Sequence, residues 1–375
     1  MNILIVKLSA IGDVVHTLPS LAALRKLYPL AHITWVIEEA AADLIKGHPY
    51  LDRVLVSYRK RWVKEISRGK IKTLKEVFLF LRELRSRRYD LVIDFHGLLK
   101  SSLIVGLAPA GRKLGFDSMQ ELSGLFVREK IPEDMTKHAV DRYLDLVHHL
   151  GGKGFSRQAK GEEPAADGYR LEEMEFLIPR GEAEEEKVAG LLAANGLIRG
   201  RFVAVNPAAL WETKLWEDEG FAGLCDRITG ELGLPVVFTG ADKKEGRRIQ
   251  ALMSLSSINL AGETSLRELS SLYWQAAAVV TTDTGPMHIA AASGAPVVAL
   301  FGPTDPARTG PYGPGHLVLR LGIACSPCFR RKCSTRACMR GIEIEAVFQA
   351  VRTLLQDRPS LHETIAADGS GDNNL

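Results

Sequence analysis

Residues 281–306, TTDTGPMHIAAASGAPVVALFGPTDP, decide the fold of this chain. The stretch predicts a buried strand (277–282), a tight turn, a short helix of small residues (287–293) and a second buried strand (297–301) that ends in a Gly-Pro loop. In an open parallel sheet, ligands bind where loops leave the carboxyl ends of the strands, and the first turn of a helix offers N–H groups to a phosphate. We therefore expect a phosphate-bearing ligand at the turn, residues 283–286.

The same alternation of strands and helices occurs on both sides of a break in the middle of the chain. The break is 151–168, whose five glycines and mixed charges without periodicity are typical of a linker. A last strand before the boundary is expected at 172–178. The predicted fold is α/β, with two doubly wound, Rossmann-like domains facing each other across a cleft. The predicted parts are an N-terminal domain (1–178), a C-terminal domain (179–345), a closing helix (342–356) and a flexible tail (357–375).

Composition limits the class of protein. The chain has 375 residues, of which 46% are hydrophobic and 25% charged, and this fits two ordinary globular domains. A net charge of only +3 gives no indication of nucleic-acid binding. The apolar N-terminal run is too short for a signal peptide, and no run approaches the roughly 20 apolar residues of a membrane-spanning helix. We expect a cytoplasmic protein with no obligate protein partner, which touches a membrane at most from its surface.

Asp13 is a candidate catalytic residue near the start of the chain. A short apolar strand, 2–8, leads through a turn into a helix, and Asp13 lies at or near the N-terminus of that helix. As a helix cap, it would stabilise the fold by about 0.5–2 kcal/mol. As a general base, it would accept a proton from an attacking hydroxyl. The residues alone favour the cap, but the two roles are compatible.

A basic run is a candidate binding surface. From Arg59 to Lys75, eight basic residues stand against one acid, Glu65. Such a run is as often a solvated surface as a binding site. In a nearly neutral chain it also suits a polyanion such as a phosphorylated glycolipid, because guanidinium and ammonium groups bind phosphate and carboxylate. Lys100, which follows the buried strand 89–94, is open to the same two interpretations.

Four of the five cysteines lie within fourteen residues, at Cys325, Cys328, Cys333 and Cys338. Four such thiols can bind zinc or an iron–sulfur cluster. Zinc sites normally use two Cys-x-x-Cys pairs, however, and only one is present. We expect a reduced or disulfide-linked basic loop ahead of a metal site, and we expect no metal or cofactor in the reaction.

The motifs carry a resemblance to a known family. The two-part stretch 283–288 and 301–306 resembles the donor-site signature of family 9 glycosyltransferases, the ADP-heptose:lipopolysaccharide heptosyltransferases. Lys-x-Ser-x-x-Gly-Asp at 7–13, followed by His-Thr-Leu-Pro, is similar to the family's opening motif. The resemblance extends from Lys7 to about Ile342. The Arg-Lys-Arg-Trp segment at 59–62 makes it most like heptosyltransferase I.

The resemblance implies an inverting, metal-independent enzyme of the glycosyltransferase B fold. It implies transfer of L-glycero-D-manno-heptose from ADP-heptose to the Kdo of the lipid A inner core, at the cytoplasmic face of the inner membrane. Asp13 would be the catalytic base, and Lys214 would stabilise the departing diphosphate in place of a metal. The implied donor-binding residues are Asp283, Thr284, Gly285, Pro286, Met287, His288 and Glu245, with Asp242 as an alternative to Glu245. The implied acceptor-binding residues are Arg59, Lys60, Arg61, Lys64, Lys100 and His138.

Several alternatives stay open. Within the family, the chain could be heptosyltransferase II or another transferase, because acceptor loops vary. From other classes, it could be a non-catalytic module that binds a nucleotide sugar or an anionic lipid, or a metal-cluster redox protein. Asp283 could serve only to cap the following helix. Glu217 stands where the family commonly has a proline after Trp216, which leaves the register of the Lys214 loop open.

Overall fold

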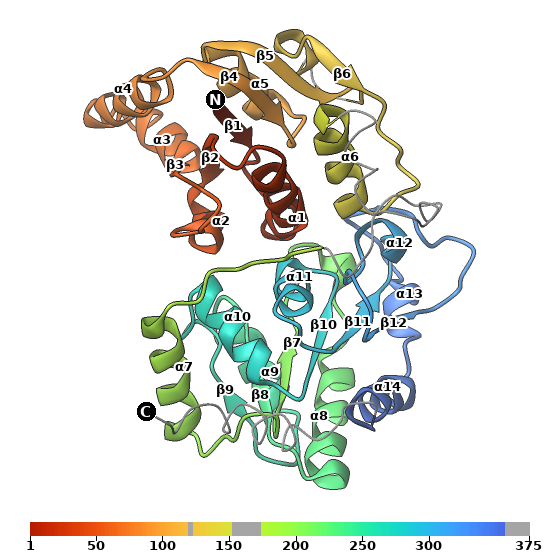
Figure 1. The fold of residues 1–375 in the computed structure, drawn as a ribbon. Helices are drawn as coiled ribbons and strands as arrows, with labels where there is room; N and C mark the ends of the chain where they lie inside the picture. The colour runs from red at the N-terminus through yellow and green to blue at the C-terminus, as the bar shows by residue number, and fades with distance from the viewer. Residues whose placement is uncertain (119–122, 152–173, 357–375) are drawn as a thin grey trace, which may run out of the picture. The chain divides into compact units, whose positions relative to one another are not determined.

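The computed structural model describes residues 1–118, 123–151 and 174–356 (Figure 1). The predicted linker, apart from Gly151, and the predicted tail at 357–375 lie outside these residues. The chain divides into two compact units. Unit 1 comprises Met1–Pro179 with Ala307–Thr309, and unit 2 comprises Arg180–Pro306 with Gly310–Leu375.

Unit 1 is built on a parallel six-stranded sheet of order β3-β2-β1-β4-β5-β6. Its strands are β1 (Asn2–Val6), β2 (His32–Glu38), β3 (Arg53–Ser57), β4 (Tyr89–Asp94), β5 (Ala110–Phe116) and β6 (Glu129–Ile131). The central strands are continuous apolar runs because helices cover both faces of a parallel sheet. Val6 pairs with Val36 on one side and Asp94 on the other, so the loops after β1, β2 and β4 leave the same edge.

Helices cover the two faces of this sheet. Right-handed crossovers that leave the centre in opposite directions put α1 and α5 on opposite faces. On one face α1 packs against α6, and on the other α3, α4 and α5 share one core cluster through Trp62, Phe80 and Ile104. The segment that was expected as an acceptor loop, from Arg59, is helical, because Trp62 anchors it to that core. The helices are α1 (Ile11–Leu27), α2 (Glu39–Ala42), η1 (Asp43–Ile45), α3 (Arg59–Ile66), α4 (Lys72–Leu84), α5 (Leu99–Leu107), η2 (Ser123–Phe126) and α6 (Ala139–Gly151).

Unit 2 contains a second parallel six-stranded sheet, of order β12-β11-β10-β7-β8-β9. Its strands are β7 (Val203–Asn206), β8 (Val236–Phe238), β9 (Ile258–Asn259), β10 (Ala278–Thr282), β11 (Val297–Phe301) and β12 (His316–Arg320). Its helices are α7 (Glu182–Ala194), η5 (Glu212–Lys214), α8 (Asp218–Leu232), α9 (Lys244–Gln250), α10 (Leu266–Gln275), α11 (Gly285–Ala292), α12 (Pro306–Thr309), α13 (Ala337–Arg340) and α14 (Ile344–Gln356). Helix α14 packs on α8 and on the strands of this unit.

The two sheets have the same topology. In each, the first strand of the unit (β1 or β7) lies beside the fourth (β4 or β10), and the strand order reverses at that point. Ligands of doubly wound sheets bind at this switch point, outside the carboxyl ends of the strands. The prediction of two doubly wound α/β domains is confirmed, although the strand expected at 172–178 is wrong for its described part, because residues 174–178 form no strand. In the described residues, no helix is both long and apolar enough to cross a membrane.

Candidate active site

Asp13 lies in the first turn of α1, directly after the switch-point strand β1. The N-cap residue of α1 is Ala10, and Asp13 Oδ2 accepts a hydrogen bond of 3.1 Å from the Ala10 N–H. The carboxylate thus helps to cap the helix from the third helical position and is not the N-cap residue itself. That bond uses only one of the two carboxylate oxygens. Asp13 is half-buried at the carboxyl edge of the sheet, and the cap holds the side chain in a fixed orientation there.

A buried lysine joins the two strands of this switch point. Lys7 is 2% exposed, and its Nζ donates to the Phe95 carbonyl at 2.9 Å and to the Tyr143 hydroxyl at 2.6 Å. Burial lowers the pKa of Lys7, and the charges of Asp13 and Asp94 act in the opposite direction. The sequence offered Lys7 only as part of a motif, because nothing in a lone lysine after a strand predicts burial.

His96 shares this environment. It follows β4, and its backbone N–H donates to Asp94 Oδ1 at 2.8 Å. Burial, together with the charges of Lys7 and Lys100, lowers the pKa of His96 to about 3. The imidazole is therefore neutral near pH 7.

Lys100 and Arg59 converge on Glu38, which ends strand β2. The Glu38 Oε1 lies 3.0 Å from the Arg59 guanidinium and 3.5 Å from Lys100 Nζ, which also donates to Ser9 Oγ at 2.6 Å. The second oxygen of Glu38 is buried and has no hydrogen-bond partner among the described residues. Glu38 was not a predicted site residue, and its second oxygen is a buried acceptor that still lacks a donor.

The remaining predicted acceptor residues lie on two other elements. On α3, Lys60 and Lys64 are exposed, whereas Arg61 is engaged by Glu76 at 2.6 Å. His138 precedes α6, and its ring lies 5.1 Å from that of His16 in an edge-to-face arrangement. The sequence could not anticipate the pairing of Arg61, because its partner comes from the next helix.

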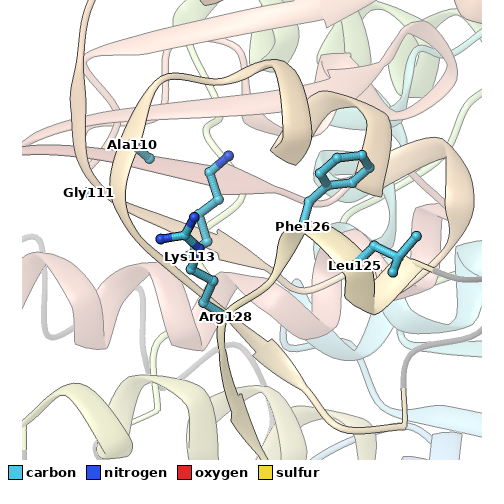
Figure 2. Close-up of a pocket in the computed structure, with 6 residues that line it drawn as sticks. All are labelled: Ala110, Gly111, Lys113, Leu125, Phe126 and Arg128. Carbon is cyan, nitrogen blue, oxygen red and sulfur yellow. The ribbon is translucent and has the colours of Figure 1, made fainter.

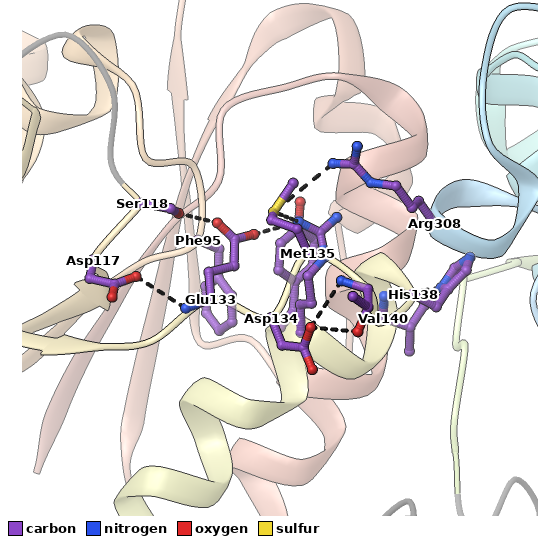
Figure 3. Close-up of polar contacts among 12 residues, drawn as sticks. Phe95, Asp117, Ser118, Glu133, Asp134, Met135, His138, Val140 and Arg308 are labelled. Carbon is purple, nitrogen blue, oxygen red and sulfur yellow. Dashed lines mark hydrogen bonds and ion pairs between the residues drawn. The ribbon is translucent and has the colours of Figure 1, made fainter. Parts of the chain in front are cut away.

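A polar network fixes the loop that leads to His138 (Figure 3). The Arg142 guanidinium contacts Glu133 at 2.5 Å and the Met135 sulfur at 3.1 Å, and Glu133 also accepts from the Ser118 hydroxyl. Arg308, from α12, approaches the same sulfur at 4.0 Å. Figure 3 shows Ser118 and Arg308 on opposite sides of Glu133 and Met135. Arg142 is 7% exposed, so the network is structural and holds His138 in place.

In unit 2, a lysine and an aspartate pair at the switch point between β7 and β10. The Lys214 Nζ lies 2.6 Å from Asp283 Oδ2, and the Thr304 hydroxyl donates to the same oxygen at 2.5 Å. Lys214 also lies over the Trp211 ring, 4.7 Å from its centroid. Three loops that are distant in sequence thus meet at one carboxylate.

Asp283 does not cap the helix that follows it. Helix α11 starts at Gly285, its N-cap is Thr284, and the Asp283 carboxylate is held by Lys214 and Thr304. Pro286 has no N–H and the Met287 N–H donates to the Thr284 carbonyl, so the turn offers fewer donors to a phosphate than the sequence suggested. The Met287 side chain is fully buried and His288 is 7% exposed, which gives both a supporting position behind the turn.

The predicted ribose-binding acids lie around the start of α9. Asp242 precedes Lys243, the N-cap of α9, and its Oδ1 accepts from the Lys244 N–H at 2.8 Å. Glu245 lies in the first turn, 4.0 Å from Arg248, and is half-buried. Because Asp242 is engaged by the backbone, Glu245 is the acid with more freedom to bind a hydroxyl.

The cysteine-rich segment braces both loops of the Lys214–Asp283 pair. The N–H groups of Cys328 and Phe329 donate to the Pro303 carbonyl at 3.0 and 2.8 Å, next to Thr304. On the other loop, the Thr213 hydroxyl donates to the Arg330 carbonyl at 2.8 Å. Glu217, the departure from the family pattern, pairs with Arg336 at 2.8 Å and Arg340 at 2.9 Å.

The cysteines themselves are all free thiols. Within the described residues, no group of three or more histidine, cysteine or carboxylate side chains has the arrangement of a metal site. A hydrogen bond from the Arg336 N–H lowers the pKa of Cys333. In its reduced form the segment therefore braces the two loops of the Lys214–Asp283 pair.

Comparison with solved structures defines the class of protein. A family 9 glycosyltransferase from Veillonella parvula superimposes with a TM-score of 0.77 at 25% identity, over 95% of this chain and 98% of that one. The Escherichia coli heptosyltransferase WaaC, solved with ADP, superimposes with a TM-score of 0.71 at 25% identity, over 94% of this chain and 100% of that one. The fold is that of a GT-B glycosyltransferase.

The sequence comparisons identify the family. The profile of glycosyltransferase family 9 (heptosyltransferase) matches residues 77–338. Lipopolysaccharide heptosyltransferase 1 of Pseudomonas aeruginosa is 30% identical over 350 residues, which cover 89% of this chain and 88% of the relative. The enzyme of the same name from Salmonella typhimurium is 29% identical, over 87% of this chain and 95% of the relative. The chain belongs to glycosyltransferase family 9, and it is an enzyme of the heptosyltransferase type.

Proposed function

We propose that the protein transfers L-glycero-D-manno-heptose from ADP-heptose to the Kdo of the lipid A inner core in lipopolysaccharide biosynthesis. The observation that carries the proposal is the chemistry of the two switch points. One holds a fixed carboxylate, Asp13, and the other holds a lysine, Lys214, against a buried aspartate. A metal-independent glycosyl transfer needs such a pair of groups, a base for the acceptor and a cation for the leaving group.

In the proposed reaction, Asp13 takes the proton of the acceptor hydroxyl. The hydroxyl oxygen attacks the anomeric carbon, the bond from that carbon to the β-phosphate oxygen breaks, and ADP leaves with the electron pair. A single displacement of this kind inverts the anomeric configuration. Lys214 offsets the charge that develops on the phosphate oxygen, so no metal is needed.

The donor contacts in this proposal come from unit 2. Asp283 holds Lys214 at 2.6 Å and orients hydroxyls of the sugar. The backbone of Thr284 and Gly285, at the start of α11, faces the diphosphate. Glu245 binds the ribose, because Asp242 already accepts the Lys244 backbone N–H.

The acceptor contacts come from unit 1. Lys100 and Arg59, held together by Glu38, neutralise an anionic sugar, and the free Glu38 oxygen accepts one of its hydroxyls. The exposed Lys60 and Lys64 extend the basic surface toward the rest of the acceptor. Because the acceptor is lipid-linked, the protein works peripherally at the cytoplasmic face of the inner membrane.

The test is release of ADP from ADP-heptose in the presence of a chelator. Three reactions are compared, with Kdo-lipid A, with an already heptosylated acceptor, and with no acceptor. We expect release only with Kdo-lipid A. Release only with the heptosylated acceptor would assign the second heptosyl transfer instead, and a requirement for added metal would contradict the role of Lys214.

A further inference from the structure

Helices α3 and α4 leave large apolar side chains exposed on the surface of unit 1. The side chain of Trp62 on α3 and that of Phe80 on α4 are buried in the core, so both helices pack against the sheet. Their outward residues nevertheless include Phe78 at 63% exposure and Ile71, just before α4, at 78%. The others are Val63, Ile66, Leu74 and Leu79.

Helix α5, on the same face of the sheet, adds a leucine stripe. Leu99, Leu103 and Leu107 recur every four residues and are 46%, 54% and 42% exposed. This spacing puts all three on one side of the helix, opposite Ile104 and Val105, which pack into the same core cluster as Phe80. We call the surface formed by α3, α4, α5 and η2 the helical face.

The short helix η2 completes the helical face and borders a cationic pocket (Figure 2). Leu125 is 71% exposed and Phe126 is 42% exposed. The Phe126 ring lies so close to α5 that a Cβ at Gly106 would come within 3.0 Å of it. Beside them is a pocket of about 200 Å³. Its lining includes the cationic side chains of Lys113 and Arg128 and no carboxylate.

The charges on the helical face have one sign once the local ion pairs are counted. Glu65 and Glu76 are engaged by Arg61, at 3.7 and 2.6 Å, and Glu83 is engaged by Arg53 at 3.5 Å. The exposed cations Lys64, Arg68, Lys72, Lys75 and Arg82 have no acidic partner in the part of the chain that the structure describes. An apolar surface bordered by unpaired cations is better suited to contact an anionic lipid surface than to be buried inside a protein.

We propose that the helical face docks on an anionic lipid bilayer. The apolar side chains of α3, α4 and α5 enter the boundary between headgroups and acyl chains, the unpaired lysines lie at the level of the headgroups, and Lys113 with Arg128 binds a lipid phosphate in the pocket. Lys113 uses two of its three donors on the Val105 and Gly106 carbonyls and has one left for the phosphate. The inference rests on the proposed function only for the reason to dock, since the acceptor is lipid-linked.

The proposal is tested by vesicle flotation of the full chain, without donor or acceptor, so that the result does not depend on transfer activity. Vesicles of phosphatidylcholine alone are compared with vesicles that also contain phosphatidylglycerol. The wild type is expected to bind the anionic vesicles. Leu74→Asp/Phe78→Asp is expected to bind them about tenfold more weakly or worse, because two charged side chains replace apolar ones in the boundary. Lys72→Glu/Lys75→Glu is expected to weaken binding by a similar factor at low salt.

A matched control uses exposed apolar residues of unit 2. Ile198 and Leu252 are 62% and 50% exposed, and Ile198→Asp/Leu252→Asp is expected to bind vesicles like the wild type. Thermal unfolding of all variants is compared in parallel, since exposed positions should leave the fold intact. The proposal is overturned if the wild type ignores anionic vesicles, or if the control loses binding as strongly as the helical-face variant. A wild-type dimer that Leu74→Asp/Phe78→Asp dissociates would also overturn it, because a second copy would then cover the face.

Discussion

The two units share a topology but fill equivalent positions with different chemistry. At the switch point of unit 1, a buried lysine, Lys7, lies beneath a carboxylate, whereas in unit 2 a carboxylate, Asp283, holds a lysine. The charge that we propose is presented to the ligand is thus reversed, from Asp13 in one unit to Lys214 in the other. A doubly wound sheet fixes where a ligand binds, and the residues after its first and fourth strands decide what chemistry occurs there.

The helices that follow the fourth strands differ in the same way. Helix α5 in unit 1 exposes three leucines, while α11 in unit 2 buries Met287, Ile289 and Ala290 and exposes no large apolar side chain. The leucine stripe is therefore not required by the fold. It is a property of the unit that we propose contacts the acceptor and its membrane.

The largest effect is expected from removing the base at the unit 1 switch point. Asp13→Asn keeps an oxygen that can accept from the Ala10 N–H, so the helix cap survives while the proton acceptor is lost. Turnover of ADP-heptose should fall by about 10²–10⁴-fold, with donor affinity nearly unchanged. Steady-state ADP release and isothermal titration with ADP measure the two quantities.

Asp13→Ala separates capping from catalysis. It should lose turnover as strongly as Asp13→Asn and should also lower the free energy of unfolding by about 1 kcal/mol, because the cap is gone. If Asp13→Asn turned over like the wild type, Asp13 would be a cap alone.

A slightly smaller effect is expected at the unit 2 switch point. Lys214→Gln should lower kcat by about 10²–10³-fold, since the cation that offsets the charge on the leaving diphosphate is removed. The matched control is Lys187→Gln, which removes a lysine of the same unit that pairs with Glu268 on the surface. A rise in KM with unchanged kcat would show that Lys214 binds the donor without assisting its departure.

The fold could be predicted from the sequence because both sheets are parallel. Strands buried on both faces are continuous apolar runs, such as 3–6 and 297–301, and polar loops follow them at the carboxyl edge. Helix α3 was not predicted, because most of its residues are charged and only one of them, Trp62, is buried. Residues 174–178 read as a strand but pair with no other strand, and pairing depends on distant residues.

The sequence predicted the candidate-site residues that lie on loops at the ends of strands, but it did not predict the residues that they contact. Asp13, Lys214 and Asp283 could be chosen because they follow strands within two-part motifs. The burial of Lys7 and the role of Glu38 depend on residues from 21 to 136 positions away, and no local pattern encodes such contacts. The cysteine spacing suggested metal or disulfide chemistry, whereas the structure uses that segment's backbone to brace Pro303 and Thr213.

A packing experiment sharpens the comparison between α5 and α11. Ile289→Ala on α11 removes a fully buried side chain and should lower the free energy of unfolding by about 2–4 kcal/mol. Leu103→Ala on α5 removes a half-exposed one and should change it by less than about 0.5 kcal/mol. Denaturant unfolding of both variants measures the difference. Equal destabilisation would mean that the leucine stripe serves the core of unit 1 and is not a free surface.

The smallest effect is a dependence of stability on pH that originates at the unit 1 switch point. Burial and neighbouring lysines lower the pKa of His96 to about 3, whereas an unfolded histidine has a pKa near 6.5. Between these values the unfolded chain binds more protons than the folded one, so stability is highest above pH 6.5 and falls as the pH is lowered. At pH 5.5 the loss from this histidine should be about 1 kcal/mol relative to pH 7.5.

His96→Asn should remove that part of the pH dependence, and His149→Asn, at an exposed histidine of α6, should not. The comparison is made by denaturant unfolding at pH 7.5 and 5.5, with the change in stability between the two pH values as the readout. Equal slopes for the wild type and His96→Asn would mean that His96 takes up its proton in the folded protein. The charges of Lys7 and Lys100 would then not keep His96 neutral, and the two switch points would not differ electrostatically in this way.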